Sequence, residues 1–146
     1  MIVSTLSRYL TLFIWSFLAA TVLPLSSELA LVALVSSDDR LVVPVIVATA
    51  GNYLGACTTY WLGRRARHLL EPHIAVQPQR ERAVKLLRRW GQPALVLSWV
   101  PLLGDALVVV AGSLAVPFGA FSLWVVIGKA VRYLVVAWAT YAWGTR

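Results

Sequence analysis

The chain has 146 residues, of which 60% are hydrophobic and only 13% are charged. Soluble domains carry about 25% charged residues, and a chain this short has too little polar sequence to cover several long apolar segments in water. The composition therefore excludes an ordinary soluble domain. It predicts an all-α integral membrane protein, because helices satisfy their own backbone hydrogen bonds in lipid.

Long and nearly uncharged stretches make up most of the sequence. They cover residues 9–35, 41–63, 94–115 and 119–143. Each matches the ~17–25 residues that a bilayer core requires. The first stretch shares features with a secretory signal peptide, but its apolar run continues to Val35 and is longer than such peptides have. We therefore expect this stretch to remain in the protein. Cys57 is the single cysteine, which excludes a disulfide within the chain.

Two short segments resemble each other, and each places an acid inside an apolar run. Pro24 is followed four residues later by Glu28. Pro101 is followed in the same way by Asp105. A proline disturbs the helical turn before it, and a carboxylate within a membrane segment usually faces a partner or a water-filled cavity. Broken segments at corresponding positions of two halves point to a transport site.

The two acids have a functional and a structural interpretation. Helices that restart after Pro24 and Pro101 expose N–H groups that bind anions such as phosphate. Glu28 is expected in the first turn of such a helix, near Ser26 and Ser27. There it could exchange a proton near neutral pH. In the structural interpretation, Glu28 and Asp105 only cap these helices.

The second apolar stretch carries small residues at helical spacing. Gly51 and Gly55 form a Gly-x-x-x-Gly pair, which lets helix backbones approach closely. We expect these glycines to serve packing. Asn52 lies between them and either shares that role or reaches into the transport site.

Most of the basic residues lie in residues 64–93, between the second and third apolar stretches. They are Arg64, Arg65, Arg67, Arg80, Arg82, Lys85, Arg88 and Arg89. The acids of this loop are Glu71 and Glu81. Lys and Arg concentrate in cytoplasmic loops, so we expect the loop in the cytoplasm, where anionic lipids would attract it. The net charge of +7 therefore does not indicate a nucleic-acid partner.

A basic amphipathic helix is predicted within this loop, over residues 79–90, with Pro78 at its start and Gly91 at its end. Its apolar side is expected to hold Val84, Leu86, Leu87 and Trp90. A helix of this kind lies on a membrane surface.

Lys129 and Arg132 interrupt the last apolar stretch, with no acid near them in sequence. Residues three apart share a helix face, and both lie too far from the ends of the stretch to reach the interface easily. With Glu28 and Asp105 they predict a buried cluster of two acids and two bases. This cluster either binds a phosphate-bearing headgroup or locks the two halves together as a static salt bridge.

The loop divides a single domain, residues 1–146, into a first half (1–63), the basic loop (64–93) and a second half (94–146). Two topologies fit. In one, all four apolar stretches span the bilayer. In the other, 9–35 and 94–115 are proline-broken re-entrant hairpins, each followed by a transmembrane helix, and the halves form two inverted repeats. Facing hairpins would supply the protein surroundings that irregular backbone needs at membrane depth.

Nearly the whole chain resembles the DedA/VTT superfamily, also called SNARE-associated Golgi proteins, and most closely its short YqaA-type branch. The similar segments are residues 23–28 with Glu28, residues 51–55 with Tyr60 and Gly63-Arg64, residues 90–101, and residues 128–133. Ser98 and Gly104 stand where the wider family carries arginines, and Ala56 where many members carry an acid. The resemblance implies re-entrant hairpins, an inverted repeat and a role in moving lipids across membranes.

We therefore predict a lipid flippase or scramblase of a bacterial inner membrane, with protons as a coupling partner and a phospholipid or polyprenyl phosphate as cargo. No enzymatic activity, cofactor, metal or nucleic-acid partner is expected, and a homo-oligomer is left open. Two other functions remain. One is an ion- or proton-coupled carrier of a small solute, and the other is a membrane-organising protein that transports nothing.

Overall fold

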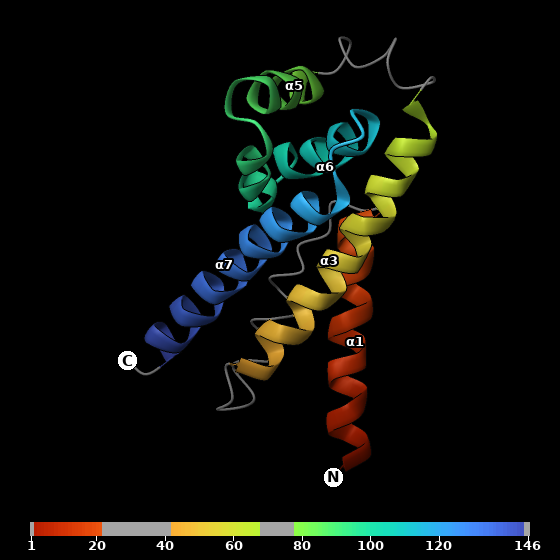
Figure 1. Ribbon diagram of the computed structural model, residues 1–146. Helices are drawn as coiled ribbons and strands as arrows, with labels where there is room; N and C mark the ends of the chain where they lie inside the picture. Colours follow the sequence, from red (N-terminus) through yellow and green to blue (C-terminus); the bar gives the residue numbers. More distant parts are fainter. Residues whose placement is uncertain (1, 22–41, 68–77, 145–146) are drawn as a thin grey trace. The chain divides into compact units, whose positions relative to one another are not determined.

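The computed structural model describes residues 2–21, 42–67 and 78–144 (Figure 1). The described residues form helices, and no strand occurs among them, which confirms the all-α class. In chain order the helices are α1 (Ile2–Thr21), α3 (Val42–Arg65), α5 (Pro78–Trp90), the 3-10 helix η2 (Gln92–Trp99), α6 (Leu103–Ser113) and α7 (Phe118–Gly144).

Helices α3 and α7 coincide with two of the apolar stretches. Residues Val42–Arg65 and Phe118–Thr140 are long and apolar enough to cross a membrane. Neither helix has a proline in its middle. Helix α3 ends on Arg64 and Arg65, whose positive charges suit the negative end of the helix dipole. The expected spans at 41–63 and 119–143 therefore exist as helices of spanning length.

The stretch 94–115 is not one helix. It is divided into η2 and α6 by Val100, Pro101 and Leu102. Leu102 has φ 64° and ψ −48°, and the Leu103 N–H donates to the Pro101 carbonyl at 2.7 Å. This is a γ-turn with a positive φ, a rare and strained conformation for a residue with a side chain. The break that the sequence predicts at Pro101 therefore exists, and residues 94–115 do not form one continuous helix.

The chain folds back at this turn. Helix α6 packs against both η2 and α5, and Figure 1 shows the three lying together. Gly104, in the first turn of α6, lies so close to the Ser98 carbonyl that a Cβ there would overlap it. Residues 92–113 thus form a helical hairpin that is broken at Pro101.

Helix α5 begins at Pro78 and ends at Trp90, as the sequence predicts. Gly91 terminates it with φ 66° and an N–H bond to the Leu87 carbonyl of 3.0 Å. The expected apolar side was wrong in part, because Ala83 and Leu87 are the buried residues. Leu86 is only half-buried, and Trp90 is 65% exposed, since α6 and η2 cover the Ala83 side of the helix.

The chain forms two compact units. One contains Met1–Gly55 and Ala130–Arg146, and the other contains Ala56–Lys129. In the first unit, α1, α3 and α7 share a core of Leu12, Val45, Ala48, Tyr133 and Ala137. In the second unit, buried residues of η2, α6 and α7 form the core, among them Leu95, Leu107, Val110, Phe121 and Val125.

Candidate functional site

Part of the candidate site lies outside the described residues. Pro24, Ser26, Ser27 and Glu28 all fall between α1 and α3, in residues 22–41. The candidate residues within the described part are Asp105 of the second hairpin, Asn52 of α3, and Lys129 and Arg132 of α7.

Asp105 lies in the first turn of α6, just after the strained turn at Leu102. Leu102 is the N-cap residue, and no side-chain hydrogen bond caps the helix, so Asp105 is not its N-cap. The positive end of the helix dipole still stabilises the negative charge of Asp105. The side chain is exposed on the protein. The expectation of a buried Asp105 is thus wrong, because Gly104 and Ala106 occupy the packed side of this turn.

Lys129 is buried, with 2% of its surface exposed, and Arg132 is half-buried one turn further along α7. The burial of Lys129 agrees with its place in an apolar helix. An ionised side chain is costly to bury, so an amine at this position needs a reason beyond packing.

A buried hydroxyl lies beside Lys129 in the chain fold. Ser98, at the end of η2, is 1% exposed, and its Oγ has no hydrogen-bond partner among the described residues. A Cβ on Gly128, the residue before Lys129, would lie 3.1 Å from that Oγ. The absence of a side chain at Gly128 therefore lets α7 lie directly against Ser98. Buried polar atoms without partners are rare in proteins and mark places where a ligand or water is accepted.

The first unit contains a similar arrangement around Asn52. Asn52 is 3% exposed, and its Nδ2 donates to the Tyr133 hydroxyl at 2.7 Å. Its Oδ1, the Ser16 Oγ and the Thr49 Oγ1 are buried without a partner in the described part of the chain. Gly51 precedes Asn52, and a Cβ there would lie 2.5 Å from the Phe13 carbonyl oxygen and 3.2 Å from the Ser16 Cβ.

Gly51 and Gly55 therefore seat α3 against α1. A Cβ on Gly55 would lie 2.7 Å from the Ala20 Cβ. In each unit a helix glycine packs on a backbone carbonyl and a serine, and a buried polar residue follows it. The separation in sequence between Pro24 and Pro101 is also the separation between Asn52 and Lys129. Ser16, Ser98 and Tyr133 were not predicted from the sequence as buried polar residues. The glycines that precede Asn52 and Lys129 could have indicated these close contacts.

Tyr60 has a structural role in the second unit. Its side chain is fully buried. Its hydroxyl donates to the Val116 carbonyl at 2.6 Å and accepts from Arg64 Nη1 at 3.1 Å. Its ring contacts Phe121 at a centroid distance of 4.4 Å. Tyr60 thus ties the end of α3 to the link between α6 and α7.

The described residues bring together no group of three His, Cys, Asp or Glu side chains that could hold a metal ion. The buried chemistry of the described part is therefore that of one amine, one amide and several hydroxyls. These groups donate hydrogen bonds, which suits an anionic or phosphate-bearing ligand.

Comparison with known proteins gives a family match over most of the chain. Residues 23–142 match the VTT domain. The chain is 41% identical over 131 residues to the "Inner membrane protein YqaA" of Escherichia coli, and this covers 89% of each chain. The protein of the same name from Shigella flexneri gives the same values. A Haemophilus influenzae protein whose name gives no function is 39% identical over 136 residues, covering 86% of this chain and 82% of its own. No solved structure matches the chain.

Proposed function

Because the chain belongs to the VTT domain (DedA) family of inner membrane proteins, we propose that it moves a phosphate-bearing lipid from one leaflet of the bilayer to the other. The buried Lys129 carries this proposal. Ionisable residues within membrane segments usually serve transport or proton transfer.

Lys129 and Arg132 are proposed to bind the lipid phosphate, because they lie one turn apart on α7 and both donate several hydrogen bonds to an anion. Asn52, Ser26 and Ser27 are proposed to supply further donors to the headgroup. The unpartnered Ser98 hydroxyl supports a polar ligand beside the second hairpin. The acyl chains would remain in the bilayer.

Glu28 and Asp105 are proposed to exchange protons during transport. The exposure of Asp105 next to the strained turn at Leu102 is consistent with access to water. We also propose that both hairpins are re-entrant, that the halves form an inverted repeat, and that residues 64–93 face the cytoplasm. The broken hairpin at Pro101 supports this for the second half.

The proposal is tested with purified protein in liposomes, by following translocation of a fluorescent phospholipid. Wild-type protein is expected to move the lipid well above the rate of protein-free liposomes. Glu28→Gln is expected to abolish translocation between pH 6 and 8, because the amide keeps the size and polarity of the carboxyl but cannot exchange a proton.

Glu81→Gln is the matched control, because Glu81 lies on the exposed surface of α5, paired with Lys85. It is expected to translocate as the wild type does. Translocation by wild-type protein no faster than in protein-free liposomes would refute the lipid function. A Glu28→Gln protein with normal activity at every pH would remove the proton role while leaving the lipid function standing.

A further inference from the structure

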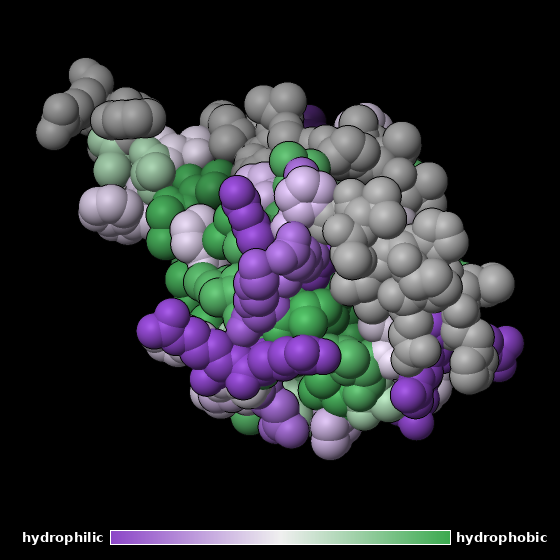
Figure 2. Space-filling model, turned by 90° about the horizontal axis from the view of Figure 1, so that it is seen from above, coloured by the Kyte–Doolittle hydropathy of each residue, from purple (hydrophilic) through white to green (hydrophobic). Residues whose placement is uncertain are grey.

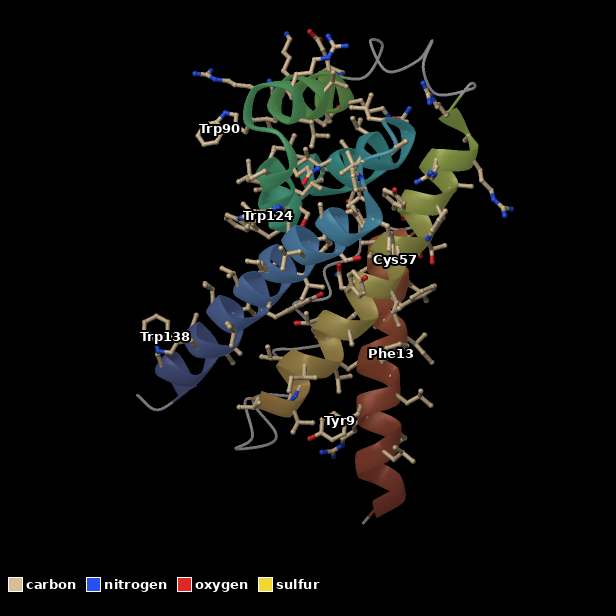
Figure 3. The ribbon with its side chains drawn as sticks, in the orientation of Figure 1. Tyr9, Phe13, Cys57, Trp90, Trp124 and Trp138 are labelled. Carbon is tan, nitrogen blue, oxygen red and sulfur yellow. The ribbon has the colours of Figure 1, made fainter. Side chains whose placement is uncertain are left out.

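The apolar face of helix α5 extends beyond the part that the fold covers. Ala83 and Leu87 already bury one side of the helix against α6 and η2. Leu86 and Trp90 lie at the edge of the same apolar face, where Leu86 is half-buried and Trp90 is 65% exposed. Figure 3 shows Trp90 projecting outward from the end of the helix. The core leaves most of Trp90 uncovered, so an exposed apolar ring at this edge needs another explanation.

A groove runs along this edge of the apolar face. It is lined by Arg82, Lys85, Leu86, Arg89 and Trp90 of α5 and by Leu103 of α6, and its volume is about 330 Å³. The five α5 residues follow the spacing i, i+3, i+4, i+7 and i+8, so they share one helix face. Three cationic side chains and three apolar side chains thus line the same groove.

The surface view agrees with this arrangement. Figure 2 looks onto the α5 side of the molecule and shows hydrophilic side chains lying across a hydrophobic surface. Arg82, Lys85 and Arg89 are all exposed, so their heads can reach an anion while their stems cover apolar surface. Leu86, Trp90 and Leu103 supply the apolar wall.

The charge of the groove is nearly all positive. The acid of α5 is Glu81, whose Oε1 lies 2.6 Å from Lys85 Nζ. This hydrogen bond with Lys85 lowers the pKa of Glu81, so Glu81 is ionised at neutral pH and offsets part of the Lys85 charge. Arg82 and Arg89 are therefore the cations best placed to hold an anion.

We propose that this groove is a binding site for an anionic phospholipid of the adjacent leaflet. The phosphate would bind Arg82 and Arg89, and the glycerol and the start of the acyl chains would lie against Leu86, Trp90 and Leu103. Arginine pairs are suited to phosphate, and tryptophan at a helix end is suited to the membrane interface. The site is separate from the proposed transport residues, because it uses neither Lys129 nor Arg132.

The test uses the full-length protein in detergent and measures retention of added phosphatidylglycerol by native mass spectrometry. Phosphatidylcholine with the same acyl chains is expected to bind at least tenfold more weakly. Arg82→Gln/Arg89→Gln is expected to weaken phosphatidylglycerol binding by about tenfold or more, from the usual contribution of each basic residue to anionic lipid binding.

Arg80→Gln/Arg88→Gln is the matched control, because it removes the same charge from the opposite side of α5 and should change binding by less than about twofold. Both double variants keep Lys129 and Arg132, so the difference between them reports the groove alone. Equal losses in the two variants would show that only bulk charge matters and would overturn the site. Unchanged thermal unfolding would show that neither variant disrupts the fold.

The apolar wall has its own test. Trp90→Ala is expected to weaken phosphatidylglycerol binding, and glycerol phosphate is expected to compete poorly with the lipid because it lacks acyl chains. Competition by glycerol phosphate as strong as that by the lipid would assign the groove to a soluble phosphate and refute a lipid occupant. The translocation assay is independent of these measurements, so the two proposals stand or fall separately.

Discussion

Two serines of the second unit differ in one respect that decides what each contributes. Ser98 and Ser113 are both 1% exposed. The Ser113 hydroxyl donates to the Val110 carbonyl at 2.9 Å, whereas the Ser98 hydroxyl has no partner among the described residues. A buried polar group with no partner costs free energy, and a paired one does not.

Ser98→Ala is therefore expected to raise the free energy of unfolding by about 1 kcal/mol, and also to slow lipid translocation if the hydroxyl serves the headgroup. Ser113→Ala is expected to lower stability by a similar amount and to leave translocation unchanged. Thermal unfolding in detergent and the liposome assay measure the two effects. A loss of stability in Ser98→Ala equal to that in Ser113→Ala would show that the Ser98 hydroxyl is paired in the folded protein.

At the residue level, the sequence predicted the burial of Lys129 but not the exposure of Asp105. Lys129 lies in the middle of a long uninterrupted helix, where most side chains contact protein or lipid whatever their position around the helix. Asp105 lies in the first turn of α6, where the backbone of the preceding turn decides which side chains face outward. That turn depends on the conformation of Leu102, and no local pattern in the sequence predicts a positive φ at a leucine.

At the level of elements, two residues with side chains adopt positive φ values within the described part of the chain. Leu102, at the hairpin break, has φ 64°, and Ala115, after α6, has φ 52°. Ala115 sits in a helix-ending motif in which the Val116 N–H donates to the Ala111 carbonyl at 3.0 Å and the Ala115 N–H to the Gly112 carbonyl at 3.0 Å. Glycine is the usual residue at this position.

Leu102→Gly and Ala115→Gly are each expected to raise the free energy of unfolding by about 1 kcal/mol, because glycine removes the strain that a Cβ causes at positive φ. Only Leu102→Gly is expected to change translocation, since it loosens the turn next to Asp105. The two variants serve as controls for each other in the unfolding and liposome assays. A destabilised Leu102→Gly protein would mean that the exposed leucine side chain, rather than the turn, stabilises the break.

Helix bounds followed well from the sequence where apolar runs were long or where proline and glycine marked the ends. The ranges of α5, α3 and α7 were predicted to within a few residues for this reason. The 3-10 conformation of η2 and the packed side of α5 were not, because both are set by α6. Leu86 and Ala83 are equally plausible core residues in an amphipathic pattern, and only the position of the neighbouring helices distinguishes them.

At the level of the whole molecule, the proposed topology rests on α3 and α7, the two helices of the described residues that are long and apolar enough to span. Two spans with two re-entrant hairpins leave both termini on the same side, opposite the basic loop of residues 64–93. In this proposed topology, the bias of Lys and Arg towards the cytoplasm would place Met1 and Arg146 outside. The basic residues of α5 would lie against the anionic inner leaflet, where the proposed lipid groove needs them.

The topology is tested by cysteine labelling, which the single Cys57 makes straightforward. In a Cys57→Ser background, Ser4→Cys and Thr145→Cys are expected to react with a membrane-impermeant reagent added to intact cells. Gln79→Cys, at the start of α5, is the control and is expected to react only after the membrane is opened. Protection of both terminal cysteines in intact cells would place the termini in the cytoplasm, which re-entrant hairpins joined to two spanning helices do not allow.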